Sequence, residues 1–168
     1  PPRSTLFPYT TLFRSVVHVF ENEENKKQEQ DSRYVKVKEV ISGDKIVLKD
    51  GRIVKYLGLE TFDESHPFFL YAYKANTRLV NRGGGRVLLT FERQEKDEKG
   101  NYLAYVFSPV NPAEEKICCF VNMELLLFGC ARVEENGRPH RYKEGFRAAQ
   151  QKAKENKFGI WGLGQSVE

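Results

Sequence analysis

Apolar and polar residues alternate in three short runs between Tyr34 and Leu59, and turn residues separate the runs. Such alternation is typical of β-strands, which predicts strands at 34–38, 45–49 and 52–59. Ser42-Gly43-Asp44 stands in the first gap and Asp50-Gly51 in the second. Asp-Gly favours a tight hairpin turn with positive φ at both central residues. The pattern therefore predicts a three-stranded antiparallel meander.

Helical spacing replaces this alternation after Ser65. The apolar residues Phe68, Ala72, Ala75 and Leu79 fall on one helical face. A helix opening at Ser65-His66-Pro67 is predicted, because proline is tolerated in a first turn. The run Gly83-Gly84-Gly85 ends it.

The second half of the chain predicts two more strands and two more helices. The strands lie at 87–91 and 102–107 and are joined by a turn at 97–100. Asn122 is suited to cap a short helix that ends at Gly129. The last helix is predicted at 142–157, with an apolar face made of Tyr142, Phe146, Ala149 and Ala153. Trp161 is expected to fold back onto the core.

This order of elements predicts a mainly β fold with helices, a five-stranded OB-fold barrel carrying three helices, over residues 34–162. Residues 21–33 contain no apolar residue, so we expect 16–33 to be a disordered linker. Residues 163–168 are interpreted as a C-terminal tail. Residues 1–15 match one reading frame of a common short-read sequencing adapter, and we interpret them as an assembly artefact. The true N-terminus, with any export signal, is then expected to be missing.

Composition narrows the function only slightly. The chain has 168 residues, 40% of them hydrophobic, and a net charge of +4, which permits a polyanionic partner without requiring one. Three cysteines, two of them adjacent, do not form a disulfide framework. No apolar stretch reaches the ~20 residues of a membrane span. We expect a monomer.

Five motifs, in order, resemble the staphylococcal nuclease (thermonuclease) family over about 130 residues. The motifs are Ser42-Gly43-Asp44, the run 55–63, the run 97–105, Val121-Asn122 with Leu125, Gly129 and Ala131, and Phe146 to Trp161. The resemblance implies an OB-fold barrel. It also implies calcium-dependent cleavage of phosphodiester bonds in DNA and RNA.

The resemblance assigns site residues position by position. The metal ligands are Asp44, Glu60 where the family has Asp, and the carbonyl of Thr61. Asp63 replaces the Glu that activates water, and Phe62 replaces a Pro that stiffens its loop. Lys55 and Asn101 replace two arginines that contact the phosphate. Only Asp44 keeps the family side chain, so a weakened site is predicted, although the Glu60 and Asp63 exchanges run in opposite directions.

Two functions stay open. One is a weak calcium-dependent nuclease acting on single-stranded DNA or RNA. The other is a non-catalytic OB-fold module that binds nucleic acid or protein. Arg138, Arg141, Tyr142 and Lys143 form a basic and aromatic cluster suited to single strands, or alternatively a solvated surface. Localisation stays open as well, although the resemblance is compatible with secretion or a periplasmic location.

Overall fold

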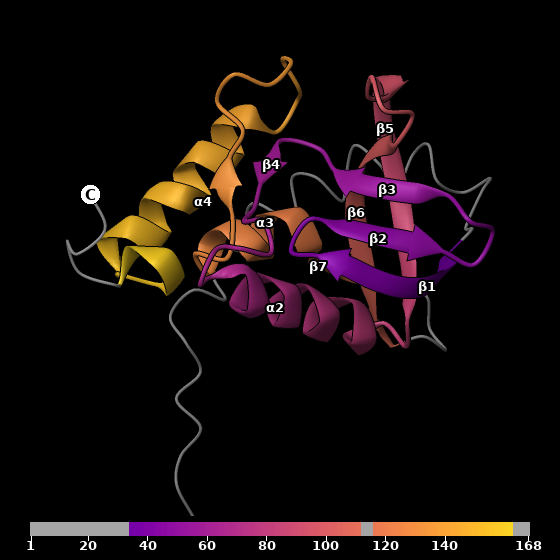
Figure 1. Ribbon diagram of the computed structural model, residues 1–168, viewed down its shortest axis with the longest axis horizontal. Helices are drawn as coiled ribbons and strands as arrows, with labels where there is room; N and C mark the ends of the chain where they lie inside the picture. The colour runs from indigo at the N-terminus through magenta and orange to yellow at the C-terminus, as the bar shows by residue number, and fades with distance from the viewer. Residues whose placement is uncertain (1–33, 112–115, 163–168) are drawn as a thin grey trace, which may run out of the picture. The chain divides into compact units, whose positions relative to one another are not determined.

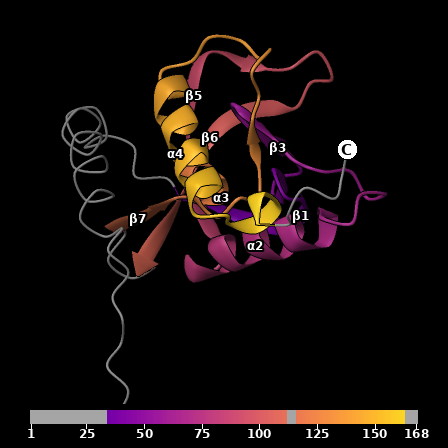
Figure 2. The ribbon, with the colours of Figure 1, turned by 90° about the vertical axis from the view of Figure 1, so that its left-hand side faces the viewer.

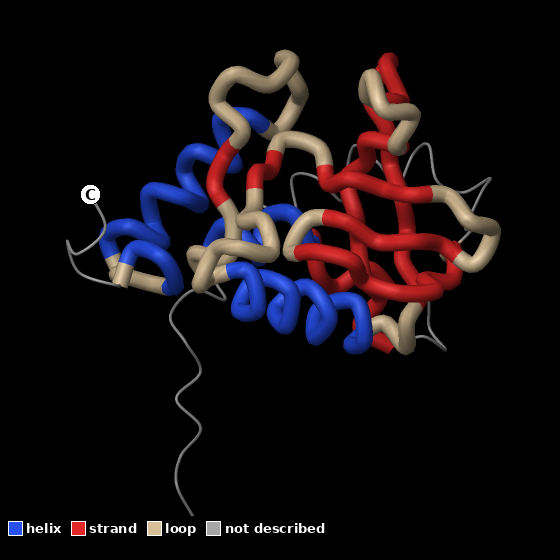
Figure 3. The backbone as a smooth tube through the Cα atoms, in the orientation of Figure 1, coloured by secondary structure: helices blue, strands red, loops and turns tan. Residues whose placement is uncertain are grey.

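The computed structural model describes residues 34–111 and 116–162. The expectations for residues 1–33 and 163–168 lie outside the described residues. Five strands form a closed barrel (Figures 1 and 3): β1 (Val35–Ser42), β2 (Lys45–Leu48), β3 (Ile53–Tyr56), β5 (Arg86–Lys96) and β6 (Tyr102–Asn111). Neighbouring strands pair antiparallel, and the parallel pairing of β3 with β6 closes the ring. The predicted five-stranded barrel is confirmed.

The alternation that predicted the first strands also forms the core. In β2 and β3 every second residue is buried, because successive side chains of a strand point to opposite faces. Ile46, Leu48, Val54 and Tyr56 are each no more than 1% exposed. Tyr56 keeps its hydroxyl satisfied by donating a 2.8 Å hydrogen bond to Asn76 of α2 (Phe69–Arg82).

The predicted third strand breaks where the functional region begins. Gly58 has φ of +77°, and a Cβ there would lie 2.5 Å from His140 Nε2. The chain bends at this glycine, so β3 ends at Tyr56, and β4 (Leu59–Glu60) leaves the barrel to pair with β8 (Arg132–Val133). A further strand that the sequence did not predict, β7 (Lys116–Phe120), pairs with β6.

Two local predictions are wrong. Lys157 is the only non-glycine residue with positive φ in the described part of the chain, so the Asp50-Gly51 turn has positive φ at Gly51 alone. Asn122 does not cap α3 (Val121–Leu127); it lies inside the helix, fully buried. Its side chain accepts a hydrogen bond from the Val106 amide at 2.9 Å and donates to the Leu57 carbonyl at 3.1 Å. Asn122 therefore ties α3 to the barrel.

Three helices pack on the barrel, as predicted. Helix α2 starts at Phe69 instead of Ser65, because the Ser65 amide bonds the Asp63 carboxylate in a preceding turn. Helix α4 (Lys143–Glu155) buries Phe146, Ala149 and Ala153, and it lies beside α3 (Figure 2). The Trp161 ring contacts Gly129 at the end of α3, as expected. No described helix has the length and apolarity to cross a membrane.

Candidate active site

A cleft of about 450 Å³ lies between the β1–β2 turn and the segment that follows β4. Five of the six side chains assigned to metal binding or catalysis line it: Asp44, Lys55, Glu60, Thr61 and Asp63. They come from the β1–β2 turn, from β3 and from residues 60–63. Asn101 does not line this cleft.

Asp44 is held rigidly at the base of the cleft. Its side chain is 5% exposed, and one carboxylate oxygen accepts hydrogen bonds from the Ser42 hydroxyl at 2.7 Å and the Thr61 hydroxyl at 2.8 Å. Gly43 lets the turn approach α2, since a Cβ there would meet the Ala72 side chain at 2.6 Å. The fold thus links two of the predicted metal residues, Asp44 and Thr61, by a direct contact.

Glu60 lies at the exposed edge of β4, opposite Arg132 in the β4–β8 ladder. Carboxylate, hydroxyl and carbonyl oxygens are the donors that Ca²⁺ prefers, so Asp44, Glu60 and Thr61 fit such an ion in kind. Within residues 34–111 and 116–162, however, no three His, Cys, Asp or Glu side chains converge closely enough to hold a metal together.

Asp63 is exposed and belongs to a local turn. Its carboxylate accepts hydrogen bonds from the hydroxyl and the amide of Ser65, and these bonds lower the pKa of Asp63. The group is therefore ionised at neutral pH but is a weaker proton acceptor than a free carboxylate.

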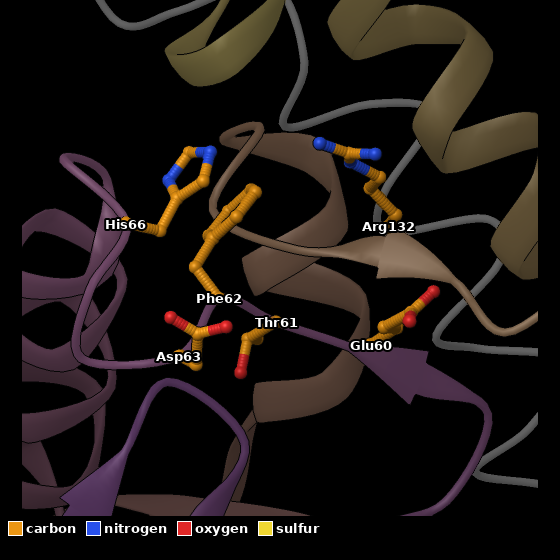
Figure 4. Close-up of a pocket in the computed structure, with 6 residues that line it drawn as sticks. All are labelled: Glu60, Thr61, Phe62, Asp63, His66 and Arg132. Atoms are coloured by element: carbon orange, nitrogen blue, oxygen red, sulfur yellow. The ribbon is translucent and has the colours of Figure 1, made fainter.

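Phe62, at the position of the loop proline, packs against side chains on both sides of the loop segment. Its ring stacks on His66 with centroids 4.4 Å apart and meets Phe68 edge-on. On the other side, the Arg132 guanidinium lies 5.2 Å from the ring. Figure 4 shows Phe62 and Thr61 pointing to opposite sides of the segment.

Both residues at the arginine positions are engaged by carboxylates. Lys55 Nζ lies 3.4 Å from a carboxylate oxygen of Glu134. Asn101 closes the β5–β6 turn: its side-chain amide donates to Asp97 at 3.0 Å, and its backbone amide donates to the same carboxylate at 2.9 Å. Although burial raises the pKa of Asp97, the bonds from Asn101 outweigh it and the pKa is lowered.

The predicted basic cluster is tied to the end of β5. The Arg138 guanidinium donates to the Gln94 carbonyl at 3.1 Å, and that of Arg141 pairs with Glu92 at 2.9 Å. Burial raises the pKa of Glu92, but the bonds from Arg141 and Tyr105 reverse the shift and lower it. Lys143 donates to the Glu135 carbonyl at 2.8 Å. Arg138 and Arg141 thus hold the segment before α4 against β5, whereas Lys143 bonds within the loop that follows β8.

Tyr142 is not available for stacking on a base in this structure. The side chain is 4% exposed, and its ring packs against Tyr105, Phe120 and Phe146. A small apolar cluster around the start of α4 therefore explains this tyrosine better than nucleic-acid contact does.

Sequence reasoning missed the ion pair of Glu134 with Lys55 and the stacking of Phe62 on His66. It also missed the contact of Arg132 with the Phe62 ring. Glu134 contacts Lys55, and Arg132 contacts Phe62, each across 70 or more positions of the sequence. No local sequence pattern therefore indicated these two contacts. The sole signal in the sequence was position 62, where Phe replaces the proline of the family.

Comparison with known proteins agrees with the fold. A family model described as staphylococcal nuclease homologue matches residues 24–162. The chain belongs to the staphylococcal nuclease family. It is 32% identical over 136 residues to a thermonuclease of Staphylococcus hyicus, covering 75% of this chain and 74% of that protein. It is 28% identical over 153 residues to the uncharacterized protein MJ1439 of Methanocaldococcus jannaschii, covering 76% of this chain and 71% of that protein.

Proposed function

We propose that this domain hydrolyses phosphodiester bonds of single-stranded DNA or RNA in a calcium-dependent reaction, and that it does so slowly. The observation that carries the proposal is the single cleft that is lined by Asp44, Lys55, Glu60, Thr61 and Asp63. Family membership and the oxygen-rich cleft both support it.

Each residue has a role that its surroundings permit. Asp44, oriented by Ser42 and Thr61, would bind the metal together with Glu60 and the Thr61 carbonyl. Bound calcium would polarise the phosphate and offset its developing charge. Asp63 would orient the attacking water, and Lys55 would donate to the phosphate.

Slow turnover follows from the two residues that stand at the arginine positions of the family. Lys55 offers a point charge instead of the planar fork that matches phosphate, and it is already paired with Glu134. Asn101 carries no charge, and its amide is used by Asp97. Loss of one well-placed donor to a developing oxyanion costs about 10²–10³ in rate.

The test is cleavage of heat-denatured DNA by the full chain, in calcium and in excess EGTA. Slow cleavage that stops in EGTA is expected. Asp44→Asn should reduce the rate by about 100-fold or more, since metal stabilisation supplies several kcal/mol. The matched control is Asp50→Asn, because Asp50 is exposed on the β2–β3 turn outside the cleft and pairs with Arg52. Equal activity in wild type and Asp44→Asn would refute the proposal.

A second candidate, a non-catalytic nucleic-acid-binding module, is favoured by the same two contacts. With Lys55 held by Glu134 and Asn101 by Asp97, transition-state stabilisation is weak while binding through other cations survives. Binding of single strands without any calcium-dependent cleavage would select this candidate.

A further inference from the structure

A second, smaller hollow lies next to the cleft. It measures about 180 Å³ and shares Glu60, Thr61, Phe62 and Asp63 with the cleft, but it also includes His66 and Arg132 (Figure 4). Thr61 reaches from the shared segment to Asp44, whereas Phe62 points the other way, toward His66 and Arg132. The two hollows therefore adjoin along residues 60–63.

Arg132 is positioned for an anionic ligand. Its guanidinium packs on the Phe62 ring at 5.2 Å, an attractive cation–π geometry that restrains the planar group. The side chain is exposed, and no ion pair to it occurs among the described residues. By contrast, Arg141 pairs with Glu92, and Arg147 with Glu135 and Glu144.

His66 supplies a donor on the other side of the same ring. Its Nδ1 accepts a 3.0 Å hydrogen bond from the Phe68 amide, so the neutral imidazole carries its proton on Nε2. Nε2 can then donate to a ligand in the hollow that His66 lines.

We propose that Phe62, His66 and Arg132 form a phosphate subsite for a single-stranded nucleic acid, occupied by a phosphate next to the one held in the catalytic cleft. The inference rests on the proposed function, because the cleft must hold a phosphate. A polynucleotide fits two adjoining anion sites, since it carries a charge on every nucleotide. Both sides of the Phe62 ring are covered, by His66 and by Arg132, so the ring offers no stacking platform. The contact is therefore with the backbone and is neutral to base identity.

The test measures binding of a fluorescent oligothymidylate of about 12 nucleotides, within the range that one OB fold covers. Anisotropy is recorded with the full chain in EGTA, so the result does not depend on cleavage. Arg132→Gln should weaken binding about 5-fold at low salt. It should also reduce the slope of log affinity against log salt by about 0.7, the value for one phosphate contact on a single strand.

Three further variants separate this subsite from general charge. Arg78→Gln removes an exposed arginine of α2 that lines neither hollow, and it should leave the slope unchanged. Combining Lys55→Gln with Arg132→Gln should reduce the slope by about twice the single value, because the two cations meet different phosphates. Phe62→Leu should weaken binding but keep the slope, since the charge of Arg132 remains. Oligoadenylate should respond to Arg132→Gln as oligothymidylate does.

Equal effects of Arg132→Gln and Arg78→Gln would overturn the subsite, and so would absence of oligonucleotide binding by wild type. A double variant with the slope of a single one would also overturn it, because both cations would then share one phosphate. Loss of calcium-dependent cleavage alone refutes the proposed activity and leaves this binding test intact.

Discussion

The pair between Lys55 and Glu134 should limit how well the cleft binds phosphate. Lys55 is the only cation assigned to the scissile phosphate, and its Nζ lies 3.4 Å from Glu134 at a site where the two side chains are 25% and 34% exposed. A phosphate that contacts Lys55 has to displace this carboxylate or tolerate its charge. Glu134→Gln should therefore increase kcat/KM.

The magnitude follows from the exposure of the pair. Two charges about 4 Å apart attract by ~1 kcal/mol in water and by ~4 kcal/mol at an effective dielectric constant of 20, but measured pairs at exposed sites contribute about 0.2–1 kcal/mol. Removing the competing charge should thus release about 1 kcal/mol to substrate binding. This corresponds to roughly a 5-fold gain in kcat/KM, which should shrink at high salt as screening increases.

The assay compares initial rates on a single-stranded oligonucleotide in calcium for Glu134→Gln and for Glu135→Gln. The second variant changes net charge equally at the neighbouring residue, which pairs with Arg147 instead. Glu134→Gln should exceed it, and the gain should vanish in a Lys55→Gln background, because directly interacting residues are not additive. Equal gains in the two Glu variants, or a gain that survives Lys55→Gln, would refute the reasoning.

Three further predictions address the turn, the core and the half-buried His140. Asn101→Arg should raise the cleavage rate by up to about two decades, and more so with Lys55→Arg. It should also lower the free energy of urea unfolding by about 0.5–1.5 kcal/mol, because the side-chain bond to Asp97 is lost. An unchanged rate with calcium still bound would show that the defect lies at Asp63. Asn122→Ala should lower the free energy of unfolding by about 2–5 kcal/mol, since it leaves the buried Val106 amide and Leu57 carbonyl unpaired. The control Asn136→Ala, at an exposed residue, should change it by no more than about 0.5 kcal/mol. Similar midpoints of urea unfolding for the two variants would contradict this. Burial lowers the pKa of His140 below its ordinary 6.5. The unfolded chain therefore takes up the proton first as the pH drops, and stability should fall below about pH 6.5. In thermal melts His140→Asn should lack this pH-dependent loss of stability, and a decline identical to that of wild type would exclude His140 as its cause.

Local periodicity was sufficient to predict β2 and β3, because every second residue of these strands is buried. It failed where a distant contact decides the backbone. Gly58 bends the chain away from β3 because His140, more than 80 residues later, packs against it, and Asn122 sits inside α3 because its amide bonds Val106 and Leu57. Neither partner is visible in a window of a few residues.

The same limit applies to the candidate site. The motifs located the cleft residues Asp44, Glu60, Thr61 and Asp63, since each lies in a short run with turn residues beside it. The motifs could not show that the cleft excludes Asn101, because its orientation depends on the Asp97 carboxylate in the same turn. They also could not show that Glu134 reaches Lys55, since that contact spans 79 positions.

These contacts divide the proposed site into an oxygen-rich half and a cationic half. In the first half, Asp44, Glu60 and Thr61 line one cleft, and Asp44 is oriented by two hydroxyl groups. In the other half, Lys55 pairs with Glu134, Asn101 donates to Asp97 in the β5–β6 turn, and Arg132 packs on the Phe62 ring. Metal affinity and substrate affinity should therefore respond to different mutations. Asp44→Asn should abolish calcium dependence while leaving oligonucleotide binding in EGTA intact. Arg132→Gln should keep calcium dependence while weakening that binding. Parallel loss of both properties in either variant would show that the two halves are coupled.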